Sequence, residues 1–115
     1  MNLGLHIRLE EIGSKVILRL EGRIDAATSP ILENKIQKLV DEKRIQLLLD
    51  FTDVDYLSSA GMRVLLASLK KIKAQHGIFG IFSVTEDVGE IIRLAGFDKI
   101  LHIFVNEQEA LQYGI

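Results

Sequence analysis

The segment Ile45 to Phe51 (IQLLLDF) is a short, nearly continuous apolar run, and it constrains the fold more than any other part of the sequence. Such a run is typical of a strand that is covered on both faces, as the strands of a parallel sheet are. Two further runs have the same character, Ile78 to Val84 (IFGIFSV) and Ile100 to Val105 (ILHIFV). Parallel strands need crossover connections, so helices are expected between these runs.

Amphipathic segments lie where those crossovers are needed. The dipeptide Ser29-Pro30 is typical of a helix start, because proline at the first helical position loses no hydrogen bond. Further helices are predicted over about 59–74, over 86–94, and over 106–113 with an asparagine cap. The apolar positions that these helices are expected to bury are Leu32, Ile36, Leu39, Val40, Met62, Leu65, Leu66, Leu69, Ile72, Val88, Ile91, Ile92 and Leu94.

The N-terminal part of the chain predicts a β-hairpin. Leu3 to Glu10 and Lys15 to Leu20 both alternate apolar and polar residues, and Gly13-Ser14 between them suits a turn. The predicted order is two strands, a helix, and then three strand–helix pairs. We therefore expect an α/β fold, with one domain over residues 1–115. Its central sheet would be mostly parallel or mixed, with about five strands and about four helices.

Composition excludes several classes of protein. The net charge of −2 and the pI of about 5.9 argue against a general nucleic-acid binder, which would be basic. No run of about 18 apolar residues could span a bilayer, and the N-terminus lacks the pattern of a signal peptide. The absence of cysteine excludes disulfides and thiol chemistry. We expect a cytoplasmic protein, a monomer or weak dimer, without a nucleic-acid or membrane partner.

No pattern in the sequence supports an enzyme. A nucleophile elbow would place glycine two residues before the serine, but Leu57 stands there before Ser59. Among the histidines, His102 is the one that could lie near a sheet edge, and its position in an alternating strand favours a structural role. Glycine-rich phosphate loops are missing, and no cofactor is expected.

Two charged clusters have ordinary explanations. Asp50 to Asp55 (DFTDVD) lacks the glycine and distal glutamate of a calcium loop, so we interpret it as a solvated loop and expect no metal. Lys70, Lys71 and Lys73 occur in the last turns of a predicted helix, where cations complement the helix dipole. That explanation is preferred to an anion-binding or membrane-binding patch.

The segment DYLSSAGM contains two adjacent serines whose roles differ. Ser58 fits a helix N-cap, since a serine hydroxyl there accepts from an otherwise unpaired backbone N–H. Ser59 would be the first helical residue, where a phosphate would meet the positive end of the helix dipole and add roughly −1.5 to −2 charge. The helix surface beside it is either an ordinary exposed face or a docking face. That surface consists of Ala60, Arg63, Val64, Ala67 and Lys71.

Three segments carry a family resemblance that runs nearly end to end: Leu20 to Pro30 (LEGRIDAATSP), Leu47 to Leu66 (LLLDFTDVDYLSSAGMRVLL) and Ile91 to Leu111 (IIRLAGFDKILHIFVNEQEAL). They resemble the anti-sigma factor antagonists, the single-domain bacterial members of the STAS family (sulfate transporter and anti-sigma factor antagonist domains). In that family, a serine just before a small residue and glycine is the phosphorylation target. The resemblance implies Ser59 as that target, with Ser58 as the alternative.

The resemblance also implies partner switching. The unmodified protein would bind an anti-sigma factor, typically a serine kinase of the histidine-kinase-like ATPase fold, and so free a sigma factor. The kinase would phosphorylate Ser59, and a metal-dependent serine phosphatase would reset the protein. Many phosphorylated members have aspartate where this chain has Ser58, so the modified serine and its kinase stay open. The residues implied in partner binding are Asp25, Ser58, Ser59, Ala60, Gly61, Arg63, Val64 and Ala67.

Two other classes of function compete with this one. The chain could be a STAS scaffold or subunit of a stress-sensing or lipid- or anion-transport complex, without kinase switching. An enzyme or nucleotide binder is the third class, and the missing phosphate loop and general base argue against it.

Overall fold

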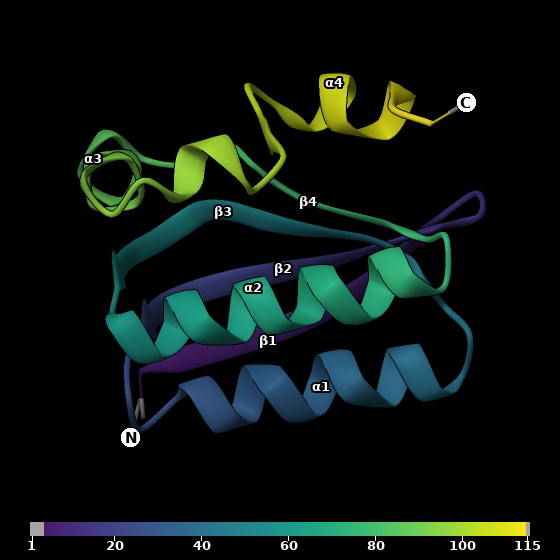
Figure 1. Ribbon diagram of the computed structural model, residues 1–115, viewed down its shortest axis with the longest axis horizontal. Helices are drawn as coiled ribbons and strands as arrows, with labels where there is room; N and C mark the ends of the chain where they lie inside the picture. Colours follow the sequence, from purple (N-terminus) through teal and green to yellow (C-terminus); the bar gives the residue numbers. More distant parts are fainter. Residues whose placement is uncertain (1–3, 115) are drawn as a thin grey trace.

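The computed structural model describes residues 4–114 as a five-stranded mixed sheet with helices on both faces (Figure 1). The strands follow the order β1-β2-β3-β4-β5, in which β1 and β2 are antiparallel and the other neighbours are parallel. The predicted α/β class is confirmed. The elements are β1 (Leu5–Ile12), β2 (Lys15–Ile24), α1 (Ser29–Asp41), β3 (Gln46–Leu57), α2 (Ser59–Ala74), β4 (Ile78–Phe82), α3 (Glu86–Leu94), the 3₁₀ helix η1 (Phe97–Lys99), β5 (Ile103–Phe104) and α4 (Glu107–Gln112).

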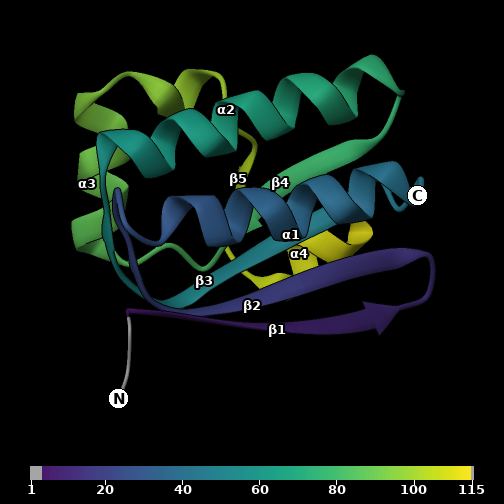
Figure 2. The same ribbon diagram turned by 90° about the horizontal axis from the view of Figure 1, so that it is seen from below.

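The helices divide between the two faces of the sheet. α1 and α2 pack side by side against one face, and α4 lies on the other (Figures 1 and 2). α3 belongs to the first side, because its buried residues Val88 and Ile92 share the core of α1 and α2. α3 packs on β3, and α4 packs on β4 and β5. Within residues 4–114, no helix is long and apolar enough to cross a membrane.

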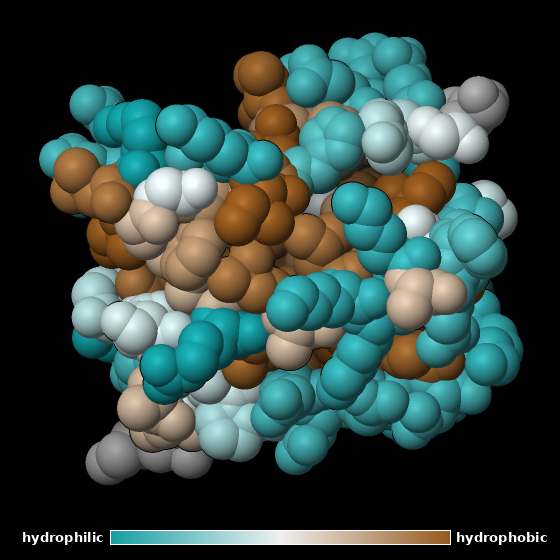
Figure 3. All heavy atoms as spheres, in the orientation of Figure 1, coloured by the Kyte–Doolittle hydropathy of each residue, from teal (hydrophilic) through white to brown (hydrophobic). Residues whose placement is uncertain are grey.

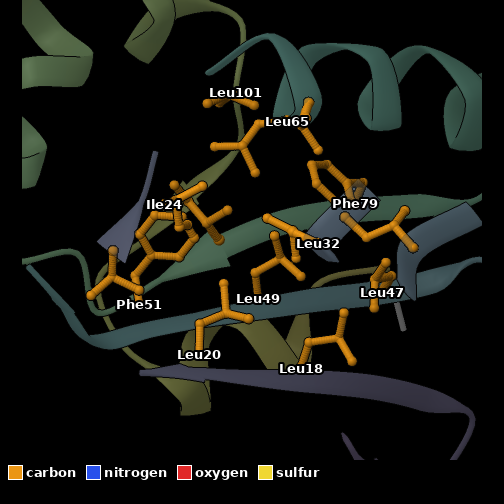
Figure 4. Close-up of a cluster of buried hydrophobic side chains, with 14 of the residues drawn as sticks. Leu18, Leu20, Ile24, Leu32, Leu47, Leu49, Phe51, Leu65, Phe79 and Leu101 are labelled. Carbon is orange, nitrogen blue, oxygen red and sulfur yellow. The ribbon is translucent and has the colours of Figure 1, made fainter. Parts of the chain in front are cut away.

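The main core lies between the sheet and the α1–α2 layer (Figure 4). Leu18, Leu20, Leu47, Leu49 and Phe51 point into it from the strands, and Leu32 and Leu65 point into it from the helices. Leu48 faces the other way, into a smaller cluster beneath α4 that also contains Ile17, Phe82, Phe104 and Ala110. Both faces of β3 are therefore covered here, which confirms the strand predicted from the continuous apolar run.

The predicted solvated loop over Asp50 to Asp55 is wrong, because β3 continues through it to Leu57. Val54 and Leu57 keep one face of the strand buried, and β2 pairs with it to the end. β2 likewise runs beyond the predicted Leu20, with register shifts in the ladder near Glu21 and Gly22. Polar residues at these positions lie on the open face of a bulged sheet rather than in a loop.

The last strand and the third helix also differ from expectation. β5 is confined to Ile103–Phe104, because Ile100 to His102 form the turn that follows η1 instead of a strand. Leu94, expected to be buried by α3, is 81% exposed. The predicted strand Ile78 to Val84 ends at Phe82. The predicted first strand began at Leu3, which lies outside the described residues.

A partly buried cluster of charges joins α4 to the sheet. Arg19 forms ion pairs with Glu10 at 3.0 Å, with Asp50 at 2.9 Å and with Glu107 at the start of α4. Burial opposes ionisation of Asp50, but hydrogen bonds from Thr52 and Arg19 hold the pKa of its carboxyl below the ordinary value. Asp50 is thus a structural residue of the sheet.

Candidate functional site

The two serines lie where β3 ends and α2 begins, and the structure separates their roles. Ser58 is the N-cap of α2: its backbone is extended and its hydroxyl accepts a hydrogen bond from the N–H of Gly61 at 3.1 Å. The N–H of Ser58 donates to the carbonyl of Ile24 at 2.8 Å, which fixes the junction to the end of β2. The cap predicted for Ser58 is confirmed.

Ser59 is the first residue of α2, and its side chain is exposed. Its hydroxyl makes no hydrogen bond to any residue of the described part of the chain. A side chain here projects beside the positive end of a helix of 16 residues, where added negative charge is favourable. Of the two serines, Ser59 is the one whose oxygen is free to react.

Gly61 allows the first turn of α2 to approach β2 closely. A Cβ atom at this position would lie 2.6 Å from Cγ2 of Ile24 and 2.8 Å from Cδ1 of Leu57. The residue is buried. Gly61 was implied to contact a partner, but it packs inside the protein and holds the serine junction in place.

Val64 was expected on a surface of α2 outside the core, and that placement is wrong. Val64 is only 8% exposed and belongs to the main core. α1 packs along this side of α2, and the amine of Lys71 donates to the amide oxygen of Gln37 on α1 at 2.6 Å. Ala60 and Ala67 are half-buried beside the same layer. This side of α2 is a helix–helix contact.

Ser59 instead opens onto a groove on the other side of α2, where α3 and η1 approach. This space, here called the Ser59 groove, has a volume of about 390 Å³. Arg63 lines it together with Ser59, one helical turn along α2. The complete lining is Tyr56, Leu57, Ser58, Ser59, Met62, Arg63, Ile91, Ala95 and Phe97.

Several walls of this groove were not expected from the sequence. Tyr56 was not singled out, and Ile91 was assigned to the core; Ala95 and Phe97 belong to a segment without regular periodicity. Figure 3 shows apolar residues gathered in the left and central part of this face, between α3 and α2. The one feature of the sequence that could have indicated this groove was the apolar character of the segment that follows α3.

Asp25 forms the turn that leads from β2 into α1. One of its carboxylate oxygens accepts from the N–H groups of Ala27 and Thr28, both at 3.0 Å, and from the hydroxyl of Thr28. The N–H of Thr28 is the main cause that holds the pKa of Asp25 below its ordinary value. Its other oxygen lies 3.6 Å from Nε of Arg23, whose guanidinium stacks on the ring of Tyr56 at 4.5 Å. Asp25 therefore fixes the conformation of the loop next to the Ser59 groove.

Nothing in this part of the molecule resembles a catalytic or metal centre. His102 is exposed and stacks on Phe104, with its ring also against the edge of Tyr113. Within residues 4–114, no cluster of three or more histidine, aspartate or glutamate side chains could hold a metal ion. The arrangement offers a free serine hydroxyl beside an apolar groove with one cation.

Comparisons with known proteins show the family to which this fold belongs. Residues 6–110 match the STAS domain. The anti-sigma-F factor antagonist RsfB of Mycobacterium tuberculosis is 32% identical over 95 residues, which cover 83% of this chain and 77% of RsfB. The structure of an anti-sigma factor antagonist from Mycobacterium paratuberculosis has a TM-score of 0.85 at 26% identity, covering 93% of this chain and 91% of its own. The phosphorylated form of the Bacillus cell fate determinant SpoIIAA has the same fold, with a TM-score of 0.70 at 18% identity over 92% of this chain and 96% of its own. The chain therefore belongs to the STAS domain family, and its relatives include the anti-sigma factor antagonists.

Proposed function

We propose that this protein is an anti-sigma factor antagonist whose binding to an anti-sigma factor serine kinase is controlled by phosphorylation of Ser59. The observation that carries the proposal is the free, exposed hydroxyl of Ser59 at the start of α2, beside the hydroxyl of Ser58 that is engaged as a cap. Relatives named anti-sigma factor antagonists and a phosphorylated neighbour of the same fold support it.

The chemistry of the switch resides in the partner. The Oγ atom of Ser59 attacks the γ-phosphorus of ATP bound to the kinase, the bond to the β-phosphate oxygen breaks, and ADP leaves while the serine proton passes to a base of the kinase. ATP and its metal ion belong to the kinase. A serine phosphatase restores the hydroxyl by hydrolysis.

The phosphate alters the surface without unfolding the domain. It adds roughly −1.5 to −2 charge at a helix N-terminus, where negative charge is tolerated. The same charge lies at the edge of the Ser59 groove, so a partner that fits the unmodified surface would have to bury it or move away. Loss of the kinase from this surface then leaves the kinase free to hold its sigma factor.

The test is binding to the cognate kinase, measured by calorimetry with purified proteins. Ser59→Ala should bind about as well as the parent and should accept no phosphate from ATP. Ser59→Asp should bind at least about tenfold more weakly, because a buried or repelled charge costs more than 1.4 kcal/mol. Ser14→Asp, which adds the same charge in the exposed β1–β2 turn, is the matched control and should bind normally.

Two results would contradict the proposal. The first is a Ser59→Asp variant that binds the kinase as tightly as the parent. The second is mass spectrometry that finds the phosphate on Ser58 after incubation with the kinase and ATP. Association with a transport ATPase and permease, in place of a kinase, would favour the scaffold function instead.

A further inference from the structure

Two separate hollows border α2, and the Ser59 groove is the first of them. A second hollow of about 140 Å³ lies at the far end of the helix, lined by Leu69, Lys73 and Ile100 among others. Ile100 is 57% exposed, although it is a large apolar residue. In Figure 3, apolar atoms extend from the region of α3 toward the centre of the face, alongside α2. Contiguous exposed apolar surface of this kind is typical of interaction sites.

The side of α2 that borders both hollows has a regular spacing. Its residues, here called the α2 flank, are separated alternately by three and four positions: Ser59, Met62, Leu66, Leu69 and Lys73. This is the spacing of the a and d positions of a heptad, along which one helix packs against another. Met62 is buried in the core, whereas Leu66 and Leu69 are only half-buried, so the apolar part of this seam is left partly uncovered at those two leucines.

The charged residues that α2 itself places next to the α2 flank are all cations. Arg63, Lys70 and Lys73 are exposed, and none has a hydrogen bond or ion pair with another residue between 4 and 114. Arg63 and Lys70 are one heptad apart, in the position that carries charges beside a coiled-coil seam. A helix that binds here would be attracted if it carried acidic residues along its edges.

From these observations we infer that the α2 flank binds an amphipathic, acidic helix of a partner protein. The helix α2 is 16 residues long, about 24 Å at roughly 1.5 Å per residue, so a partner helix of about four turns would span it. The inference goes beyond the proposed function, because it assigns a secondary structure and a charge to the partner segment. It does not depend on whether Ser59 is the residue that a kinase modifies.

A second copy of this chain is a poor occupant of the same surface. A two-fold contact between two α2 flanks would set Arg63 and Lys70 of one copy against the same cations of the other. The acidic helix α4 has six residues, and its Glu107 is already paired with Arg19. The remaining occupant is a helix from another protein.

The experiment uses a synthetic peptide of about three heptads, with leucine at the a and d positions and glutamate at the flanking e and g positions. A peptide of the same composition, with its leucines scrambled so that no stripe forms, is the control. Binding to the full chain is measured by fluorescence anisotropy, and the contacted amides are located by NMR. The striped peptide should bind saturably and shift amides of α2 and η1, and the scrambled peptide should not.

Exposed substitutions then test the two parts of the inference without disturbing the fold. Ile100→Gln should weaken binding about fivefold by removing apolar contact, and the pair Arg63→Glu with Lys70→Glu should weaken it about tenfold and abolish its salt dependence. The matched controls lie on α1: Ile31→Gln, which removes another exposed apolar side chain, and Lys38→Glu, which removes another exposed cation. Both controls should bind like the parent.

The inference is overturned if the scrambled peptide binds equally well, if the shifted amides lie elsewhere, or if the α1 controls lose as much affinity as the groove variants. It is also overturned if the chain alone sediments as a dimer that Ile100→Gln dissociates, because a second copy would then occupy the α2 flank.

Discussion

Replacement of Gly61 by alanine should destabilise the protein, although alanine is the better helix former. The new methyl group would lie 2.6 Å from Cγ2 of Ile24, 2.8 Å from Cδ1 of Leu57 and 3.1 Å from the carbonyl oxygen of Ile24. Neither neighbour can move easily, since Ile24 and Leu57 are 0% and 1% exposed. The carbonyl of Ile24 is also fixed by its hydrogen bond from Ser58.

The magnitude follows from two opposing contributions. Overpacking of a tight core costs about 1–3 kcal/mol, whereas glycine to alanine in a helix interior gains at most about 1 kcal/mol, and less in the first turn. The expected net loss for Gly61→Ala is therefore about 1–2 kcal/mol in the free energy of unfolding. Displacement of the α2 start should also weaken binding at Ser59, because Ser58 and Ser59 are attached to this turn.

The assay is urea unfolding followed by circular dichroism, with Gly89→Ala as the matched control. Gly89 lies within α3, and a Cβ atom there would meet only Cγ1 of Val84, at an ordinary 3.7 Å. The same substitution should therefore stabilise the protein at Gly89, by about 0.5–1 kcal/mol. If Gly61→Ala proved as stable as the parent, or if both variants changed stability with the same sign, the close approach inferred for Gly61 would be refuted.

Two further changes test the cap and the buried charge cluster. Ser58→Ala should lower the free energy of unfolding by about 1 kcal/mol, whereas Ser58→Asp should keep the cap and most of that stability. If thermal unfolding found the two variants equally stable, Ser58 would not act as a cap. Because the pKa of Asp50 is lowered in the folded state from a reference of 3.8, its stabilisation is present above that pH and is lost as pH falls through the folded pKa. Asp50→Asn should thus be less stable than the parent at pH 7, and the difference in their free energies of unfolding should become smaller below about pH 4. A difference that does not change with pH would rule out this linkage.

The sequence predicted those features that depend on residues close together in the chain. Ser58 as a cap, a helix start at Ser29-Pro30 and the buried character of Ile45 to Phe51 are confirmed, although α1 begins one residue before the proline, with Thr28 at its N-cap. A cap needs only the N–H groups of the following turn, and a strand covered on both faces shows itself as an uninterrupted apolar run. Such local patterns keep their meaning whatever the rest of the chain does.

The acidic segment after that run shows where local patterns fail. Asp50 and Asp53 suggested the end of the strand, yet β3 continues because β2 pairs with it and because Arg19 neutralises Asp50. The pairing partner and the cation come from a strand about 30 residues earlier in the chain. Propensity alone could not show that a carboxylate would find a partner on the sheet.

The position of the candidate docking surface was decided only by tertiary structure. A helical projection of α2 identifies its buried centre, but the residues at the two borders, Val64 on one side and Leu66 on the other, depend on which helices lie next to them. α1 covers the border of Val64, whereas hollows that reach α3 and Ile100 leave the other border open beside Ser59. The sequence alone indicates that a capping serine and a second serine begin an amphipathic helix. Which side of that helix a partner can reach was set by packing between segments far apart in the chain, because burial at a helix border is a property of the neighbouring element and not of the helix.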